Sequence, residues 1–318
     1  MNTPEPSPRW ISQCSRSWDQ FWFTPTAPHT LALIRILVGM MLFYSHLVWL
    51  LDLQAFVGPH SWISTDASRF LQEQNYTWTY LWYISSPTAL LVTHLIGMAI
   101  FIMLALGIFT PITSVLSWFI AICYCHRLEG ALFGLDQINV MLVMYLMISP
   151  SGDAYSIDRR RRMKQQSSPD TIRSVRANIA MRLMQIHLCI IYLFGGIGKM
   201  RGSEWWDGSA SWWALANPEY QSLDMTWLAP HIMILSAITH VTVFWETFYC
   251  VLIWHRLTRP VMLMLAVLVH GSIALCMGMV TFGCIMLVAN LAFIAPSTID
   301  AWIQRGLPKG QGRGGHPT

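Results

Sequence analysis

Long apolar stretches without charge clusters restrict the fold of this chain more than any other feature. Most of these stretches have about the 20 residues that a helix needs to cross the bilayer hydrocarbon, and two of them, 112–126 and 132–149, are shorter. Backbone polar groups in hydrocarbon must be satisfied within the protein, so such spans are helices. The sequence predicts an all-α polytopic bundle of about eight transmembrane helices, at 30–51, 88–108, 112–126, 132–149, 180–199, 229–253, 260–277 and 279–295.

Composition agrees with a membrane protein and excludes two other classes. Of the 318 residues, 54% are hydrophobic and only 11% are charged, whereas soluble domains carry roughly 25% charged residues. Disorder is excluded because it needs low hydrophobicity and high net charge. A net charge of +4 is too small for a strongly basic nucleic-acid binder. We therefore expect a lipid bilayer, and no nucleic acid, as the partner.

The lysines and arginines predict the orientation of the bundle. With a cytoplasmic N-terminus, the inner segments hold 14 of these residues and the outer segments hold 4, as the positive-inside rule requires. The run Arg159–Arg162 is the densest block, and a cytoplasmic loop explains it without a nucleic-acid partner. We predict a multi-pass protein of the inner (plasma) membrane. Residues 1–29 are expected to form a cytoplasmic N-terminal segment, 30–296 the membrane domain and 297–318 a flexible cytoplasmic tail.

Ionisable residues inside the predicted spans are costly and are functional candidates. Counted along upright helices, Arg35, Arg182 and Glu246 fall in the inner half of the bundle, and Arg35 either snorkels to the interface or pairs with Glu246. The outer half holds His46, His94, His126, Asp136, Lys199, His231 and His270. This distribution predicts a polar cavity that opens outward. The histidine spacing gives no metal site, and we expect none.

Two long outer segments, 52–87 and 200–228, are rich in tryptophan and tyrosine. An aromatic belt at the membrane interface explains them, and so does a flat wall beside a pocket. The seven cysteines form no disulfide or zinc pattern. They are expected to pack as small apolar residues.

Lys199 differs from the other polar residues because it ends an apolar helix through Gly195-Gly196-Ile197-Gly198. Glycines let a neighbouring backbone or a flat ligand approach closely. A lysine removed from water in such a place is a usable base. The alternative is a side chain that extends to the surface.

These residues resemble a known family. The segment Tyr192–Met200, followed by Trp205-Trp206-Asp207-Gly208, is similar to the lysine segment of vitamin K-dependent gamma-carboxylases. Three further stretches agree, namely His126–Gly134, Asp153–Asp158, and His270 with Gly278-Met279. The whole chain looks like the bacterial branch of that superfamily, the HTTM (horizontally transferred transmembrane) domain proteins.

The resemblance implies an activity and a set of site residues. Lys199 takes the position of the base in the vitamin K oxygenation chemistry, His126 a supporting position and His270 a place in the pocket wall. The implied cofactor is a reduced quinone (a vitamin K-type hydroquinone) or another flat hydrophobic ligand. Gly198 and Cys125 replace a lysine and an asparagine of the family pattern, and nothing here corresponds to the large domain that engages the protein substrate. We predict quinol-linked, carboxylase-like lyase or oxygenase chemistry. The alternative is a non-enzymatic binding, carrier or assembly protein on the same scaffold.

Overall fold

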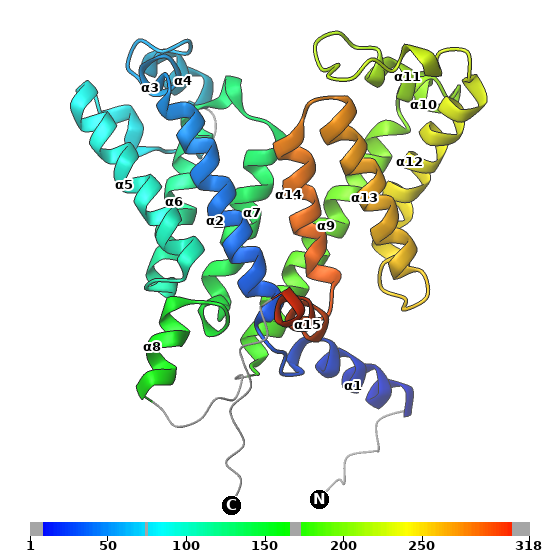
Figure 1. The fold of residues 1–318 in the computed structure, drawn as a ribbon, viewed down its shortest axis with the longest axis horizontal. Coiled ribbons are helices and arrows are strands. Elements are labelled where there is room, and N and C mark those ends of the chain that lie inside the picture. The colour runs from blue at the N-terminus through cyan, green and yellow to red at the C-terminus, as the bar shows by residue number, and fades with distance from the viewer. Residues whose placement is uncertain (1–8, 74–75, 166–172, 307–318) are drawn as a thin grey trace, which may run out of the picture.

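A computed structural model describes residues 9–73, 76–165 and 173–306 of the chain. This part is all-α, and its one β-bridge joins Thr26 to Ser174. Figure 1 shows the helices side by side as a bundle. Residues 1–8 of the predicted N-terminal segment and 307–318 of the predicted tail lie outside the described residues.

A helix lies at each of the eight predicted spans. Five of them, α2, α5, α9, α12 and α13, are long and apolar enough to cross a membrane, and α7 is a shorter apolar helix. The all-α polytopic fold is thus confirmed, whereas a total of eight crossings stays a prediction. The bounds are α2 (His29–Leu50), α5 (Pro87–Leu106), α6 (Thr110–Arg127), α7 (Gly134–Ile148), α9 (Val175–Lys199), α12 (Ile232–Leu252), α13 (Arg259–Cys276) and α14 (Val280–Asn290).

Local sequence sets several helix ends. Pro87, Pro111 and Pro260 each stand in the first turn of a helix, where the missing N–H costs nothing. The side chains of Ser86 and Ser174 accept hydrogen bonds from the first turns of α5 and α9, as N-cap residues do. The prolines agree with the predicted helix starts, whereas α9 begins at Val175 after its Ser174 cap, ahead of the predicted start at 180.

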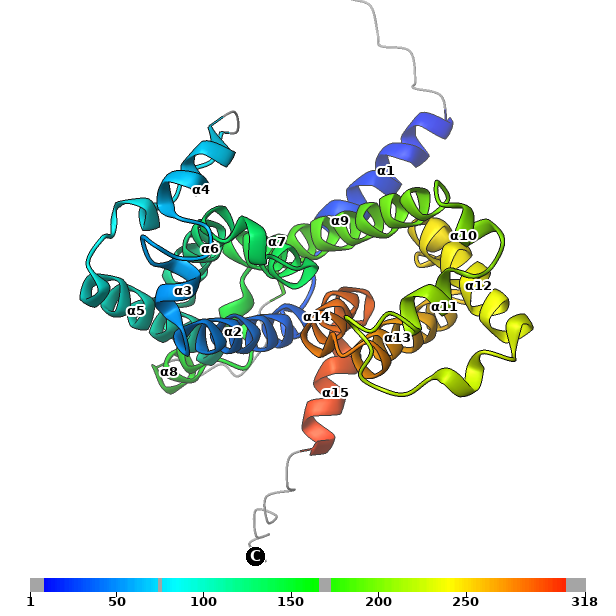
Figure 2. The same ribbon diagram turned by 90° about the horizontal axis from the view of Figure 1, so that it is seen from above.

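The bundle has two halves that meet along α2, α7 and α14. One half contains α5 and α6 with the short helices α3 (Leu53–Val57) and α4 (Thr65–Gln72). The other contains α9, α12 and α13 with α10 (Ser203–Trp206) and α11 (Ala210–Leu215). Seen from above in Figure 2, α9 runs lengthwise across its half instead of end-on, so this helix is strongly tilted.

The segments that flank the spans contain helices. α1 (Arg9–Phe23) packs against α9, where Asn178 donates to the Phe21 and Trp22 carbonyls at 2.7 and 2.9 Å. α15 (Pro296–Gly306) packs against α2 and buries Ile299 completely. Residues 297–306 are therefore helical, where the sequence predicted a flexible tail. The chain turns by 117° between Val280–Phe293 and Pro296–Arg305.

Arg35 is neither paired with Glu246 nor extended to the surface, so both explanations offered for it are wrong. Its fully buried guanidinium donates to the carbonyl of Leu104 at 2.8 Å and to that of Tyr155 at 2.7 Å. A planar fork of donors suits two carbonyls at once, here one in the last turn of α5 and one in the loop before α8 (Ile157–Gln165). Arg35 thus binds the end of α5 to this loop.

Asp158 caps the first turn of α6 from the neighbouring helix α8. Its carboxylate accepts hydrogen bonds from the amides of Phe109 at 3.0 Å and Thr110 at 2.8 Å. Burial alone would raise the pKa of Asp158, but these hydrogen bonds and the charge of Arg162 outweigh burial and lower it. The capping interaction is therefore strongest when Asp158 is ionised.

We expect Asp158→Asn to cost about 1 kcal/mol of unfolding free energy at neutral pH. Because the folded-state pKa lies below that of the unfolded chain, this contribution is present above about pH 4 and is lost as the pH falls through the folded-state value. Thermal unfolding of both proteins in detergent at pH 7 and about pH 3.5 measures it. If the wild type and Asp158→Asn differed in stability by the same amount at the two pH values, a role for the ionised carboxylate would be contradicted.

Candidate functional site

An ion pair links α9 to α12. The ammonium of Lys199 donates to Oε2 of Glu246 at 2.6 Å. The Glu246 side chain is 10% exposed and that of Lys199 is 28% exposed, so the carboxylate is almost removed from solvent and the ammonium is partly accessible. Glu246 and Asp136 are the only acidic residues in the eight predicted spans. An acid at such a place needs a partner, because an isolated buried charge is very costly.

Glycine at 196 explains how the two helices come so close. A Cβ atom added there would lie 2.8 Å from the backbone nitrogen of Thr247, so any other residue would push α9 and α12 apart. A Cβ at Gly198 would meet nothing within 4 Å. The ammonium of Lys199 also lies 5.4 Å from the ring centroid of Trp205, within the range of a cation–π contact. The pair thus has a flat aromatic neighbour on one side.

The sequence placed Lys199 and Glu246 in opposite halves of the membrane, and the contact corrects this. Counting residues along the chain treats the helices as upright, but α9 is tilted. The turn of α9 that ends at Lys199 therefore packs against the middle of α12. The signal that could have suggested the pairing is the scarcity of acidic residues in the spans.

His270 is joined to the same helix pair through a buried hydrogen-bond chain. Asn290 donates from Nδ2 to the Met286 carbonyl and to the Tyr192 hydroxyl, each at 2.8 Å, and its Oδ1 accepts from Tyr249 at 2.6 Å. The proton of the Tyr192 hydroxyl has no other acceptor among the described residues, so it is directed at Nε2 of His270, 2.7 Å away. A neutral imidazole that accepts at one nitrogen carries its proton on the other.

The chain thus assigns the proton of His270 to Nδ1, which is buried and has no partner among the described residues. Tyr192 and Lys199 are seven positions apart on α9, about 10 Å along a helix axis. Trp245, next to Glu246, packs edge-on to the His270 ring with centroids 5.8 Å apart. The structure brings Lys199 and His270 to one seam, between α9, α12 and α13.

His126 lies elsewhere. It stands near the end of α6, and its Nδ1 is 2.8 Å from the carbonyl of Trp78. In both Figure 1 and Figure 2, α6 lies in the half of the bundle opposite to α9, α12 and α13. The structure does not bring His126 together with Lys199.

Acidic, cysteine and histidine side chains form no cluster of three that could hold a metal ion within the part of the chain that the structure describes. All seven cysteines are free.

The long apolar helices define a multi-pass membrane protein. Its bundle contains a polar site, the ion pair between α9 and α12, next to the close helix contact at Gly196. A model of the HTTM domain matches residues 23–297. The chain therefore belongs to the HTTM domain family, which confirms the resemblance found in the sequence. No match was found among curated proteins or among solved structures.

Proposed function

We propose that this HTTM-domain protein is a quinol-linked membrane enzyme, with the Lys199–Glu246 pair as its proton-accepting group. The observation that carries the proposal is the 2.6 Å contact between Lys199 Nζ and Glu246 Oε2 inside an apolar bundle. The proposal adds Glu246 to the residues that the family resemblance implies.

The pair changes what Lys199 needs in order to act as a base. An ammonium has three donors and no lone pair, so Lys199 accepts a proton only after its own has passed to Glu246. The short contact provides the path for that transfer. Transfer within the pair leaves the net charge unchanged, so it avoids leaving one charge alone in an apolar place.

The surroundings of the pair fit a flat hydrophobic molecule with a hydroxyl group. Trp205 offers a ring face beside Lys199, and the side of α9 at Gly198 is open. His270 has an unused Nδ1 donor on the same seam. When bound, a reduced quinone would supply a hydroxyl proton, and its two electrons would pass to dioxygen, the oxidant in the oxygenation chemistry of the family that the sequence resembles. Lys199 and Glu246 would orient that hydroxyl and hold its proton.

Substitution of Lys199 tests the proposal. Lys199→Met removes the basic nitrogen and keeps an apolar chain of similar length, so oxidation of an added reduced quinone should fall at least a hundredfold, the usual scale for losing a general base. Arg201→Met removes an exposed cation two residues away and should keep full activity. Full activity of Lys199→Met, or wild-type protein without quinol oxidation, would favour a non-enzymatic carrier or assembly protein.

A further inference from the structure

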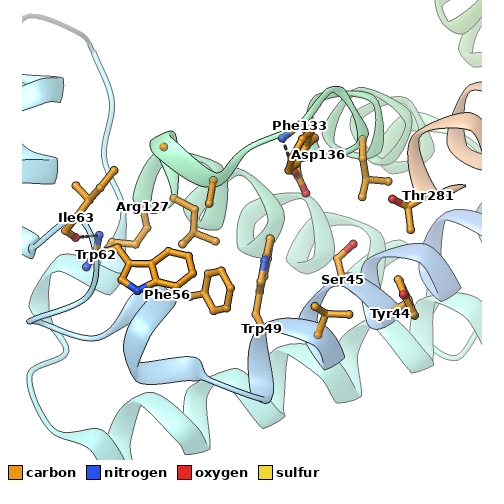
Figure 3. A pocket seen from close by; sticks show the side chains of 15 residues that line it. Tyr44, Ser45, Trp49, Phe56, Trp62, Ile63, Arg127, Phe133, Asp136 and Thr281 are labelled. Atoms are coloured by element: carbon orange, nitrogen blue, oxygen red, sulfur yellow. Dashed lines mark hydrogen bonds between the residues drawn. The ribbon is translucent and has the colours of Figure 1, made fainter. Parts of the chain in front are cut away.

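A cavity of about 520 Å³ lies in the half of the bundle that does not contain the Lys199–Glu246 pair. It is bounded by α2, by α3 and the loop after it, and by the α6–α7 connection, with Thr281 of α14 at its edge. Figure 3 shows the rings of Trp49, Phe56 and Trp62 along it. Its size is in the range of pockets for small ligands.

Two opposite charges line this cavity without ionic partners. The described residues contain three ion pairs, His29–Asp300, Arg162–Asp153 and Lys199–Glu246. Neither Arg127 nor Asp136 belongs to one of them, although both are more than nine-tenths buried. Figure 3 shows Arg127 on one side of the cavity and Asp136 on the other, with aromatic rings between them.

Each charged group is only partly satisfied. Arg127 donates to the carbonyls of Ile63 and Gly58 at 2.9 and 2.8 Å and to the Ser61 hydroxyl at 2.7 Å, and its buried Nε–H has no partner among the described residues. Asp136 accepts the Phe133 amide at 3.0 Å on Oδ2. Its Oδ1 receives no hydrogen bond from any other described residue.

The chemistry of the walls identifies the missing partner. A buried carboxylate beside aromatic faces favours an ammonium group, and a buried guanidinium favours a phosphate. The rim is apolar and open, with Tyr44 49% and Phe133 58% exposed, and in a bilayer such a rim contacts acyl chains. We propose that this cavity binds a phospholipid with a zwitterionic headgroup, its ammonium at Asp136 and its phosphate at Arg127.

Lipid retention by the purified protein tests this proposal. Protein in detergent is mixed with phosphatidylethanolamine, with phosphatidylglycerol or with N-acetylated phosphatidylethanolamine, all with the same acyl chains, and bound lipid is counted by native mass spectrometry. The wild type should retain phosphatidylethanolamine about tenfold more than the other two, since only it has a free ammonium. Equal retention of the three lipids would overturn the proposal without any variant.

Two variants locate the site. Asp136→Asn keeps an oxygen for the Phe133 amide and removes the charge, so it should lower phosphatidylethanolamine retention about tenfold and leave phosphatidylglycerol unchanged. Trp49→Leu should weaken retention without altering charge. Asp207→Asn, at an exposed position outside the cavity, is the matched control. Unchanged retention in Asp136→Asn, or displacement of the lipid by equimolar free phosphoethanolamine, would contradict a lipid site.

Discussion

Lys199→Met and Glu246→Gln, made singly, should each destabilise the protein, and the double variant should recover much of the loss. Each single change leaves one charge of the pair without its partner in a poorly solvated place, which costs 3–5 kcal/mol for fully buried pairs. Because the Lys199 side chain is 28% exposed, we expect about 1–3 kcal/mol here. In the double variant no charge is left, so the two effects should not add.

Comparing the single and double variants also separates the effect of the ion pair on stability from its effect on catalysis. The double variant should fold nearly as well as the wild type and still lack quinol oxidation, because neither remaining side chain accepts a proton. Unfolding in detergent gives the free energies, and the quinol assay on the same samples gives the activity. Additive destabilisation would show that the 2.6 Å contact does not contribute to stability. An active double variant would refute the pair as the proton acceptor.

The second large effect is expected at Gly107, which ends α5. Its φ of +68° is in the left-handed region, and an added Cβ would overlap Nη1 of Arg35 and the side chain of Ser156. Gly107→Ala therefore combines a strained backbone with displacement of a buried guanidinium, and should cost about 3 kcal/mol or more. Thermal unfolding of the purified protein and its yield in the membrane both report this loss.

Gly271 provides the matched control, because it lies within α13 and an added Cβ would meet nothing within 4 Å. Gly271→Ala should be neutral or stabilise the protein by about 0.5–1 kcal/mol, since alanine loses less conformational entropy in a helix. Similar losses in the two variants would mean that the contacts of Gly107 with Arg35 and Ser156 are unimportant.

Much of the fold could be predicted because the bilayer imposes a simple rule. Apolar length identifies a helix, and Pro111 and Pro260 mark first turns that the structure confirms. The start of α9 was not predicted, because the helix begins at Val175, ahead of the apolar stretch that starts at 180. The helix α15 was missed because only part of its surface is apolar. It is held by the contact of Ile299 with the rest of the bundle, which no local pattern reveals.

The candidate site was predicted only in part because its partners depend on helix tilt. Sequence identified Lys199 through its glycines and His270 through the family resemblance. It could not show that Glu246 is reached by Lys199 and not by Arg35, because depth counted along straight helices puts Glu246 in the inner half with Arg35 and Lys199 in the outer half. The tautomer of His270 depends on Asn290, which lies on another helix and has no sequence signal of its own.

Arg35 and Arg127 have a mechanical consequence. They lie at opposite ends of one half of the bundle. Arg35 donates to the Leu104 carbonyl in the last turn of α5 and to the Tyr155 carbonyl, and Arg127 donates to the loop carbonyls of Ile63 and Gly58. These contacts tie the loops of that half to buried side chains of its helices. In the other half, the Lys199–Glu246 ion pair joins α12 to α9. A proton delivered to Glu246 would remove this attraction, so proton uptake would weaken the contact between the two helices, and separating the helices would favour proton uptake.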